Sequence, residues 1–550
     1  MSTRDGSLSR DTDSDATPPG NAASCECCYC EDCWPKQLLH RLGKKVAAKH
    51  EKVDLALYIR LRDTFNPPSD GKIQDKLHQD DEETTWFAVN RDSSGKPEIL
   101  YDSGRYASLV ANGSTAGSHL VRFPALVSFI GQTGAGKSTL IKILIERMLN
   151  PNVIEGGIDA ASCREIFPAP VVGSFENSNV PTSGDVHLYA DPLSYFAERP
   201  IFYVDSEGLE GGEKPPIATK CRDPTRRSYP GEKATRSSWT KNRLTKKWRF
   251  SRETSRKIDW ADAPEKEKRE FAVTQFYPRI LYTFSDVIVF VLRNARTFES
   301  AVVTRLVDWA AEVLNASTNQ PRLPHAIIVI NASDARTSPE QWDVDYATTS
   351  LLESVGQSIP SEKDAERVAK LLKHWHLPQK PVRNVRDLLL CYYSSVRVVH
   401  IPDDDQYLKM EAQIEKLHSE IRSACEASML AKKRARMLMN ADELDELFQA
   451  AFEHFSYSLN SPFDLIKAAR KNIPIPRDFA GNVTKVAVAI RDTLQADGKT
   501  INVDDIFEPL SLMVATCIFL ECSRGNWKGE MLTYTQILGC LTQAFPRFCY

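Results

Sequence analysis

The stretch Gly131-Gln132-Thr133-Gly134-Ala135-Gly136-Lys137-Ser138 decides the fold of this 550-residue chain. It matches the pattern G-x-x-x-x-G-K-[ST], follows an apolar run at 125–130 that predicts a strand, and precedes an amphipathic segment at 139–149 that predicts a helix. Such a loop turns successive backbone N–H groups inward, and the helix N-terminus adds a partial positive charge. The segment 131–138, called the glycine-rich loop below, therefore predicts a site for the phosphates of a nucleoside triphosphate.

Each position of the glycine-rich loop has an expected role. The side chain of Lys137 is expected to reach the β- and γ-phosphates, and the Ser138 hydroxyl is expected to ligate Mg²⁺. Gln132 and Thr133 are candidates for assisting hydrolysis. The nucleotide contacts expected from this part of the chain are those of Gly131, Gln132, Thr133, Gly134, Ala135, Gly136, Lys137, Ser138 and Thr139.

Around the loop, from about residue 122 to 402, apolar runs alternate with helical segments. This alternation predicts an α/β domain with a mainly parallel sheet covered by helices on both faces. The expected strands are 125–130, 186–189, 201–204, 287–292, 326–330 and 396–401. After residue 403 the apolar residues recur at three- and four-residue spacing, which predicts a helical region at 403–550.

The chain before residue 122 has a different character. Residues 1–35 are predicted to be disordered and rich in cysteine, because their hydrophobicity is low. Residues 36–121 predict an N-terminal extension with a basic helix at 36–52 and a hairpin from the runs 85–89 and 98–101. These expectations place the boundaries of the α/β domain at 122 and 402.

Two further motifs supply oxygen ligands near the loop. Asp205-Ser206-Glu207-Gly208 follows the strand 201–204, so Asp205 can hold Mg²⁺ through water and Gly208 can bring its N–H to a γ-phosphate. Thr182, with Ser183 as its alternative, precedes the strand 186–189 and offers a hydroxyl to the same ion. The predicted Mg²⁺ ligands are Ser138, Thr182 and Asp205, and the predicted catalytic residues are Lys137, Thr182 and Gln132.

The fourth motif, Asn331-Ala332-Ser333-Asp334, follows the strand 326–330 and concerns the base. The Asp334 carboxylate can accept hydrogen bonds from N1–H and N2–H₂ of guanine, a pair of donors that adenine lacks. Asn331 can tie this segment to the glycine-rich loop. Ala332 stands where the usual pattern has a lysine whose stem covers the base, which weakens stacking. A plain Asn/Asp helix cap after a strand is the alternative.

In this order the four motifs resemble the GTP-binding domains of the translation-factor-like class of P-loop GTPases. The glycine-rich loop with Thr139 looks like the septin and immune-associated paraseptin types. The run Asp205-Ser206-Glu207-Gly208-Leu209 is similar to the guanylate-binding and very large inducible (dynamin-like) GTPases. The resemblance covers about residues 122–402 and is specific at the first two motifs. It implies a Mg²⁺-dependent GTP/GDP switch that often forms a homodimer through its nucleotide face.

Leu209 departs from the small GTPases, which carry at this position a glutamine that orients the attacking water. We therefore expect a large GTPase with slow intrinsic hydrolysis of GTP to GDP that self-association increases. Arg222, Arg226 or Arg227 is a candidate for stabilising the developing phosphate charge. Two alternatives remain: a nucleotide-binding scaffold that does not hydrolyse and, less favoured, a P-loop ATPase.

Two segments outside these motifs carry their own hypotheses. Residues 210–270 are rich in Lys, Arg, Ser, Thr and Pro and predict a basic loop inserted in the α/β domain. A solvated loop is the main interpretation, and binding to an anionic membrane surface or a partner is the functional alternative. Nucleic acid is disfavoured because no RNA-binding motif accompanies the basic residues.

The second segment is a cysteine cluster, Cys25, Cys27, Cys28, Cys30 and Cys33. It has three interpretations: zinc held by Cys25, Cys28, Cys30 and Cys33, acylated cysteines that anchor the chain beside the basic helix, or a redox-exposed segment. The net charge of −3 favours no polyanionic partner, and no apolar run reaches the ~18 residues of a spanning helix. With no signal peptide recognisable, we expect a cytoplasmic protein, with peripheral membrane attachment as the alternative.

Overall fold

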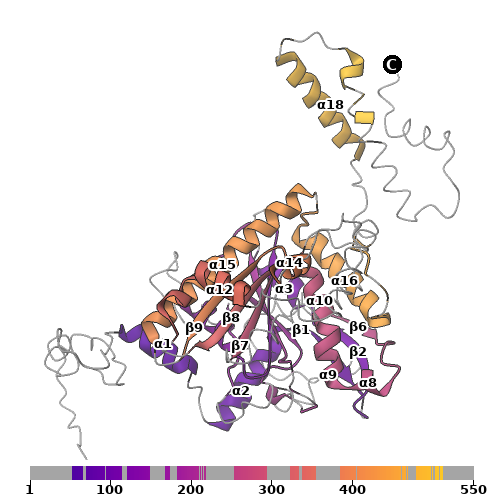
Figure 1. Ribbon diagram of the computed structural model, residues 1–550. Helices are drawn as coiled ribbons and strands as arrows, with labels where there is room; N and C mark the ends of the chain where they lie inside the picture. Colours follow the sequence, from indigo (N-terminus) through magenta and orange to yellow (C-terminus); the bar gives the residue numbers. More distant parts are fainter. Residues whose placement is uncertain are drawn as a thin grey trace, which may run out of the picture.

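A mixed, mostly parallel sheet with flanking helices forms the centre of the described part of the chain (Figure 1). The computed structural model describes residues 53–65, 70–92, 94–113, 121–148, 167–173, 182–209, 211, 213–214, 216–218, 253–293, 323–333, 337–354, 385–403, 406–435, 437–459, 461, 463–465, 468, 479–496, 498, 502–506, 508, 510–511 and 514. Within these residues the chain is an α/β protein, as the alternation of strands and helices predicts.

The sheet has nine strands in the order β6-β2-β1-β4-β5-β3-β7-β8-β9. The strands are β1 (Thr85–Arg91), β2 (Pro97–Asp102), β3 (Ala125–Gly131), β4 (Val186–Ala190), β5 (Ile201–Ser206), β6 (Thr254–Lys257), β7 (Val287–Arg293), β8 (His325–Ser333) and β9 (Val396–Pro402). Pairing is parallel from β5 through β3, β7 and β8 to β9, and antiparallel from β5 outward to β6. The six strands expected between residues 122 and 402 are therefore confirmed.

The helices cover this sheet and extend the chain beyond it. They are α1 (Leu55–Phe65), α2 (Gly71–Asp81), η3 (Glu82–Thr84), α3 (Arg105–Asn112), α4 (Lys137–Met148), α8 (Pro264–Glu267), α9 (Arg269–Phe271), the π-helix η6 (Ala272–Phe276), α10 (Tyr277–Phe284), η8 (Pro339–Trp342), α12 (Val344–Ser354), α14 (Val385–Tyr392), α15 (Tyr407–Arg434), α16 (Ala441–Tyr457) and α18 (Phe479–Ala496). Every residue of β4 and β5 is buried, as expected for strands covered on both faces.

Two features of the sheet and its flanking helices differ from the expectations of the sequence. The hairpin β1–β2 is present, but it belongs to the same sheet, because β1 pairs antiparallel with β4. Strand β6 and helices α8 and α9 lie within 210–270, which the sequence presents as a loop, and β6 pairs with β2. The alternating apolar and polar residues of a short hairpin predict two strands, but they do not predict which sheet the strands join. The sheet is chosen by the edge that offers unpaired backbone groups.

The beginning of the expected helical region packs on the sheet. Met410, Ile414, Leu417 and Ile421 are buried in the same apolar core as the strands, so this stripe predicts the helix α15 and its buried face correctly. Helix α18 lies away from the sheet in Figure 1 and has a small apolar cluster of its own. The expectations for residues 1–52, including the cysteine cluster, lie outside the described residues.

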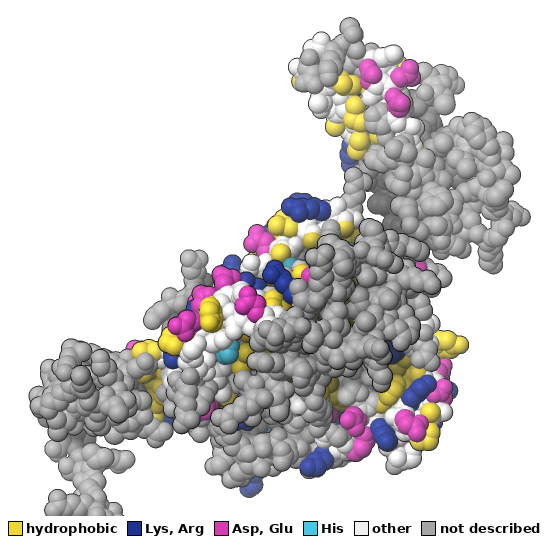
Figure 2. All heavy atoms as spheres, in the orientation of Figure 1, with side chains coloured by type: hydrophobic (Ala, Val, Ile, Leu, Met, Phe, Trp, Pro, Cys, Tyr) yellow, Lys and Arg dark blue, Asp and Glu magenta, His cyan; other side chains and the backbone are white. Residues whose placement is uncertain are grey.

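Figure 2 shows acidic and basic side chains interspersed along α15, with hydrophobic side chains between them. Leu408 and Leu430 are exposed near opposite ends of this helix, so they do not form one patch. Among the residues that the structure describes, none of the helices combines the length and the apolar character that crossing a membrane requires.

Candidate functional site

The glycine-rich loop joins the carboxyl end of β3 to the start of α4, as its sequence pattern predicts. Gly134 and Gly136 have φ angles of 74° and 95°, in the left-handed region that favours glycine. A Cβ at Gly136 would collide with the Asn331 amide, and one at Gly131 would collide with the Val291 carbonyl oxygen of β7. Close approach of neighbouring strands, as well as backbone conformation, therefore demands glycine in this loop.

Asn331 connects the loop to the end of β8. Its Nδ2 donates a hydrogen bond of 2.8 Å to the carbonyl oxygen of Ala135, which is the contact that the sequence predicts. Strand β7 lies between β3 and β8, and all three are parallel, so their carboxyl ends meet at one edge. This edge of an open α/β sheet is where ligands of such folds bind.

Three oxygen-bearing side chains converge beside the loop. The Asp205 Oδ2 atom accepts hydrogen bonds from Ser138 Oγ at 2.7 Å and from Ser183 Oγ at 3.0 Å, and the two hydroxyls are 3.2 Å apart. Asp205 is fully buried, and its second oxygen, Oδ1, has no hydrogen-bond partner among the described residues. A buried carboxylate oxygen without a donor lowers the stability of the folded protein, so a ligand that donates to Oδ1 would be bound favourably.

Burial explains the electrostatics of Asp205. It raises the pKa of the carboxyl group, and the nearby ammonium of Lys137 and the hydroxyls of Ser138 and Ser183 partly offset that rise. Lys137 is itself buried, and its Nζ donates to the carbonyl oxygens of Gly131 and Gln132 at 3.1 Å each. Burial lowers the pKa of Lys137, whereas the carboxylates of Asp205 and Glu207 act in the opposite direction.

Of the two hydroxyl residues that the sequence offers here, Ser183, the alternative to Thr182, is the one that contacts Asp205. The Thr182 side chain instead lies against Gly173, where an added Cβ would collide with its hydroxyl, and its carbonyl oxygen accepts a hydrogen bond from Ala218 N. Both residues are hydroxyl-bearing neighbours, so composition could not separate them. The direction in which each side chain points depends on the backbone path into β4.

The segment from Asp205 to Leu209 lies directly on the loop. Leu209 N donates to Gly131 O at 3.0 Å, and Thr133 N donates to Leu209 O at 2.9 Å. A Cβ at Gly208 would come within 2.6 Å of the Thr133 Cα, so only glycine permits this approach. The spatial proximity that the sequence expects between these two motifs is therefore present.

Two residues of importance to this edge have no role in the sequence analysis. Glu207 is 2% exposed and forms a two-pronged ion pair with Arg269, with Nε to Oε1 at 2.8 Å and Nη2 to Oε2 at 2.5 Å. Glu207 stands inside a recognised motif, so its position was a usable signal. Arg269 follows a long basic stretch and has no motif that marks it.

The remaining predicted site residues make fewer contacts at this edge or lie outside the described residues. Gln132 pairs with Leu209 in an isolated parallel bridge, and Thr139 lies half-buried in the first turn of α4. Asp334 and the three candidate arginines, Arg222, Arg226 and Arg227, lie outside the described residues. Within the described part, no group of three or more His, Cys, Asp or Glu side chains could hold a metal ion. The oxygen cluster beside the loop contains one carboxylate, that of Asp205, and two hydroxyls.

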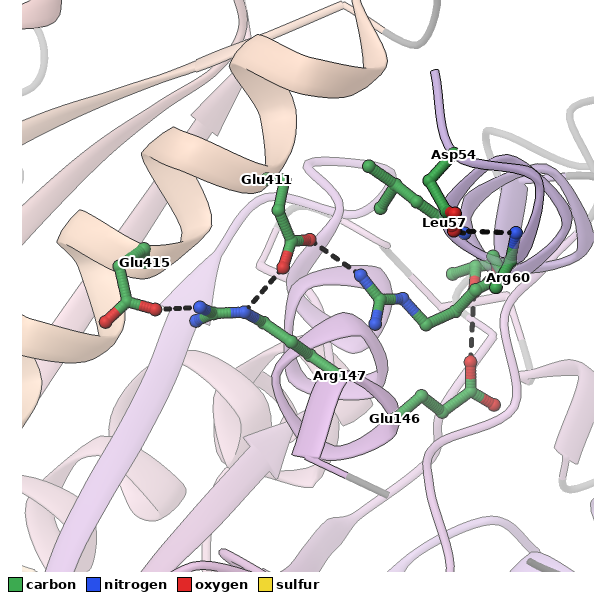
Figure 3. Close-up of polar contacts among 9 residues, drawn as sticks. Asp54, Leu57, Arg60, Glu146, Arg147, Glu411 and Glu415 are labelled. Carbon is green, nitrogen blue, oxygen red and sulfur yellow. Dashed lines mark hydrogen bonds and ion pairs between the residues drawn. The ribbon is translucent and has the colours of Figure 1, made fainter. Parts of the chain in front are cut away.

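The far end of α4 is held by ion pairs (Figure 3). Glu411 of α15 binds both Arg147 Nε of α4 and Arg60 Nη2 of α1, each at 2.7 Å, and Glu415 also contacts Arg147. The Thr64 hydroxyl donates to Glu146 at 3.1 Å. The helix that begins at the loop is thus anchored to both the N-terminal extension and the long helix α15.

Two comparisons with known proteins give no further identification. A scan against the profiles of protein families finds no match, and a search of curated proteins finds no similar chain. The chemistry of the edge therefore rests on its residues: a glycine-rich loop at the start of a helix, a buried lysine, and a carboxylate with two hydroxyls. This set is suited to an anion bound beside a divalent cation.

Proposed function

We propose that this chain is a P-loop GTPase that binds GTP with Mg²⁺ at the glycine-rich loop and hydrolyses it to GDP. The nucleotide state would control self-association or the binding of a partner. The observation that carries the proposal is the cluster of Ser138, Ser183 and Asp205 at the end of the glycine-rich loop, with the Asp205 Oδ1 atom buried and without a partner.

The donor set fits Mg²⁺. This ion prefers oxygen ligands, is commonly held by one or two carboxylates plus substrate phosphates, and keeps several of its waters. Ser138 and Ser183 would hold it directly, and Asp205 would hold it through water that donates to the partnerless oxygen. When bound, the ion neutralises charge on the phosphate oxygens.

The residues of the loop supply the rest of the phosphate site. The Lys137 ammonium donates hydrogen bonds to the carbonyl oxygens of Gly131 and Gln132, which hold it beside the loop. Lys137 is the first residue of α4, where the helix dipole adds partial positive charge. Gly208 N lies in the segment that contacts Thr133, so a γ-phosphate would change the position of this segment directly. Leu209 brings an apolar side chain to the position next to Gly208, which supports slow turnover by a single molecule.

Guanine specificity is supported by the end of β8. Asn331 holds this strand end against the glycine-rich loop, and Asp334 follows three residues later in the sequence. A carboxylate at that point would accept the two donors of guanine. The proposal therefore names GTP rather than ATP.

A scaffold that binds GTP without hydrolysis is the second candidate. It is favoured by one observation: both backbone groups of Leu209 are engaged with the glycine-rich loop, in a segment that offers no polar side chain at the expected place of a catalytic glutamine. Single-turnover hydrolysis of labelled GTP separates the two. Hydrolysis that is lost in Ser183→Ala supports the enzyme, whereas tight binding with no product supports the scaffold.

Competition of labelled GTP by ATP and by xanthosine triphosphate tests the nucleotide. We expect GTP to outcompete ATP, and Asp334→Asn to weaken GTP and to favour xanthosine triphosphate, because the amide exchanges an acceptor for a donor. Equal competition by ATP would instead identify a nucleotide site without base discrimination. Absence of binding by any triphosphate would refute the proposed function.

A further inference from the structure

Behind Gly208, a buried polar cluster connects the 205–209 segment to the helices that follow the basic stretch. Its centre is the ion pair of Glu207 with Arg269, in which two nitrogens of one guanidinium meet both oxygens of one carboxylate. Such two-pronged pairs fix the relative orientation of their partners as well as their distance. Arg269 begins the short helix α9, so the pair spans two segments that are far apart in the sequence.

Asp185 joins the same cluster from a third segment. Its N–H donates to Glu207 Oε2 at 3.3 Å, and its carbonyl oxygen accepts from Glu207 N at 3.0 Å. Its carboxylate accepts the hydroxyl of Tyr277, the first residue of α10, at 2.9 Å. Asp185 therefore contacts both Glu207 and α10. It also lies two residues after Ser183 in the sequence.

A second connection reinforces the first. Both oxygens of the Glu213 carboxylate accept backbone N–H groups, from Arg269 at 3.0 Å and from Glu270 at 3.1 Å. Glu207 and Glu213 thus bind the start of α9 at two points. A movement of the 205–209 segment that keeps the geometry of the Glu207–Arg269 pair would carry the start of α9 with it.

The segment that receives this movement has an unusual conformation. Residues Ala272–Phe276 form a π-helix between α9 and α10, and single π-helical turns are frequent at functional sites. The ring of Trp260 is buried, and its centroid lies 5.4 Å from the ring centroids of Phe271 and of Phe276. Trp260 is therefore placed to report on any rearrangement of α9 and the π-helix.

We propose that Arg269 is a positioning residue that holds Glu207, fixes the Gly208 backbone at the glycine-rich loop, and transmits the nucleotide state to α9 and the π-helix. The inference rests on the proposed function, because it specifies the regulation of the same site. Arg269 contacts neither the oxygen cluster nor the glycine-rich loop in the contacts above, so its action passes through Glu207. A γ-phosphate that draws in Gly208 must pull on the Glu207–Arg269 pair.

The test measures Trp260 emission in the full chain with GDP and with a non-hydrolysable GTP analogue, and subtracts the spectra of Trp260→Phe. We expect different Trp260 spectra for the two nucleotides in the unsubstituted protein. Arg269→Gln and Glu207→Gln should each remove most of that difference. The ratio of affinities for the GTP analogue and GDP should fall by about 2- to 30-fold, the range for residues that couple two sites.

Lys268→Gln is the matched control, because Lys268 is the exposed neighbour of Arg269 and loses the same charge. Its Trp260 spectra and affinity ratio should match those of the unsubstituted protein. If Arg269→Gln fails to fold by circular dichroism, Arg269→Lys keeps the charge without the two-nitrogen fork and should show the same loss of signal. A variant that only weakened packing would lower thermal stability without changing the nucleotide dependence of Trp260.

The outcomes separate this inference from the proposed function. If the unsubstituted protein binds labelled GTP while folded Arg269 variants keep the full Trp260 response and affinity ratio, Arg269 has no positioning role and the GTPase proposal stands. If the unsubstituted protein binds nucleotide with no change in Trp260, transmission to α9 is overturned. If it binds no nucleotide, both fall together.

Discussion

The two ends of helix α4 differ in whether their buried charges face opposite charges from neighbouring helices. At the Met148 end, Arg147 has carboxylate partners from α15, and the same Glu411 also binds Arg60 of α1. At the Lys137 end, the buried Asp205 keeps one oxygen without a partner. One helix thus has one end held by ion pairs to α1 and α15 and another end beside a buried carboxylate oxygen that lacks a donor among the described residues.

This difference teaches where the molecule can change. Charges that already face an opposite charge resist rearrangement, because a partner removed from a buried or half-buried pair leaves a charge uncompensated. An acceptor without a donor, such as Asp205 Oδ1, gains a hydrogen bond when a ligand that carries a donor binds. The contrast predicts that substitutions at the Lys137 end alter ligand binding, and that substitutions at the Met148 end alter stability alone.

The largest expected effect is that of Lys137→Ala on nucleotide binding. Loss of the ammonium leaves phosphate charge uncompensated, and we expect affinity for GTP to fall by about 30-fold to several thousand-fold, from the 2–5 kcal/mol typical of such truncations. Equilibrium binding of a labelled GTP measures the change. Lys142→Ala, on the same helix and paired only loosely with Glu146 at 4.0 Å, should bind within about twofold of the unsubstituted protein.

A pair of glycines isolates the effect of close packing at the Lys137 end. Gly136 and Gly95 have similar φ angles of 95° and 89°, but a Cβ would meet the Asn331 amide at Gly136 and open space at Gly95. Gly95→Ala should lower the free energy of unfolding by about 1–2 kcal/mol through backbone strain alone. Gly136→Ala should cost roughly 1–3 kcal/mol more through overpacking.

Urea denaturation of both glycine variants measures these two costs. Gly136→Ala should also weaken GTP binding, whereas Gly95→Ala should leave it unchanged because it lies in the β1–β2 turn. Equal destabilisation by the two substitutions would show that the Asn331 contact adds nothing.

Glu411→Gln tests the Met148 end. The amide keeps the shape of the side chain but removes the charge that Arg60 and Arg147 share. The pairs are partly exposed, so we expect a loss of only about 1 kcal/mol in the free energy of unfolding. Affinity for GTP should not change, and a loss of affinity would mean that the two ends of α4 are coupled.

The smallest effect is a pH dependence that comes from Asp205. Its pKa is raised in the folded protein by burial, so its charged form is disfavoured there relative to the unfolded chain. The stability that it contributes is present below its unfolded pKa of about 3.8 and is lost as the pH rises through the raised value. Asp205→Asn should therefore become progressively more stable than the unsubstituted protein over that range.

Thermal melts of the two proteins without nucleotide, between about pH 4 and pH 8, measure the slope. Asp205→Asn should at the same time reduce the Mg²⁺ dependence of GTP binding, because the amide has no negative charge and one acceptor fewer for the water of the ion. A stability difference that stays constant across this range would show that burial does not disfavour the charged form of Asp205 in the folded protein.

The sequence by itself determined the elements whose signal is local. The glycine-rich loop with its strand and helix, the six strands between 122 and 402, the link from Asn331 and the placement of Asp205 to Gly208 all follow from residue types at short spacing. Left-handed glycines, apolar runs and a terminal hydroxyl have the same physical meaning wherever they occur. These rules require no knowledge of the rest of the chain.

The tertiary structure alone decided the partnerships over long distances. It placed Ser183 rather than Thr182 at Asp205, joined β1, β2 and β6 to the main sheet, and brought Arg269 to Glu207 across 62 positions of the chain. Many arginines and hydroxyl groups could satisfy the same carboxylates by composition. The choice among them is made by strand order and backbone direction, because hydrogen bonds form only between groups that the fold has already brought within about 3 Å.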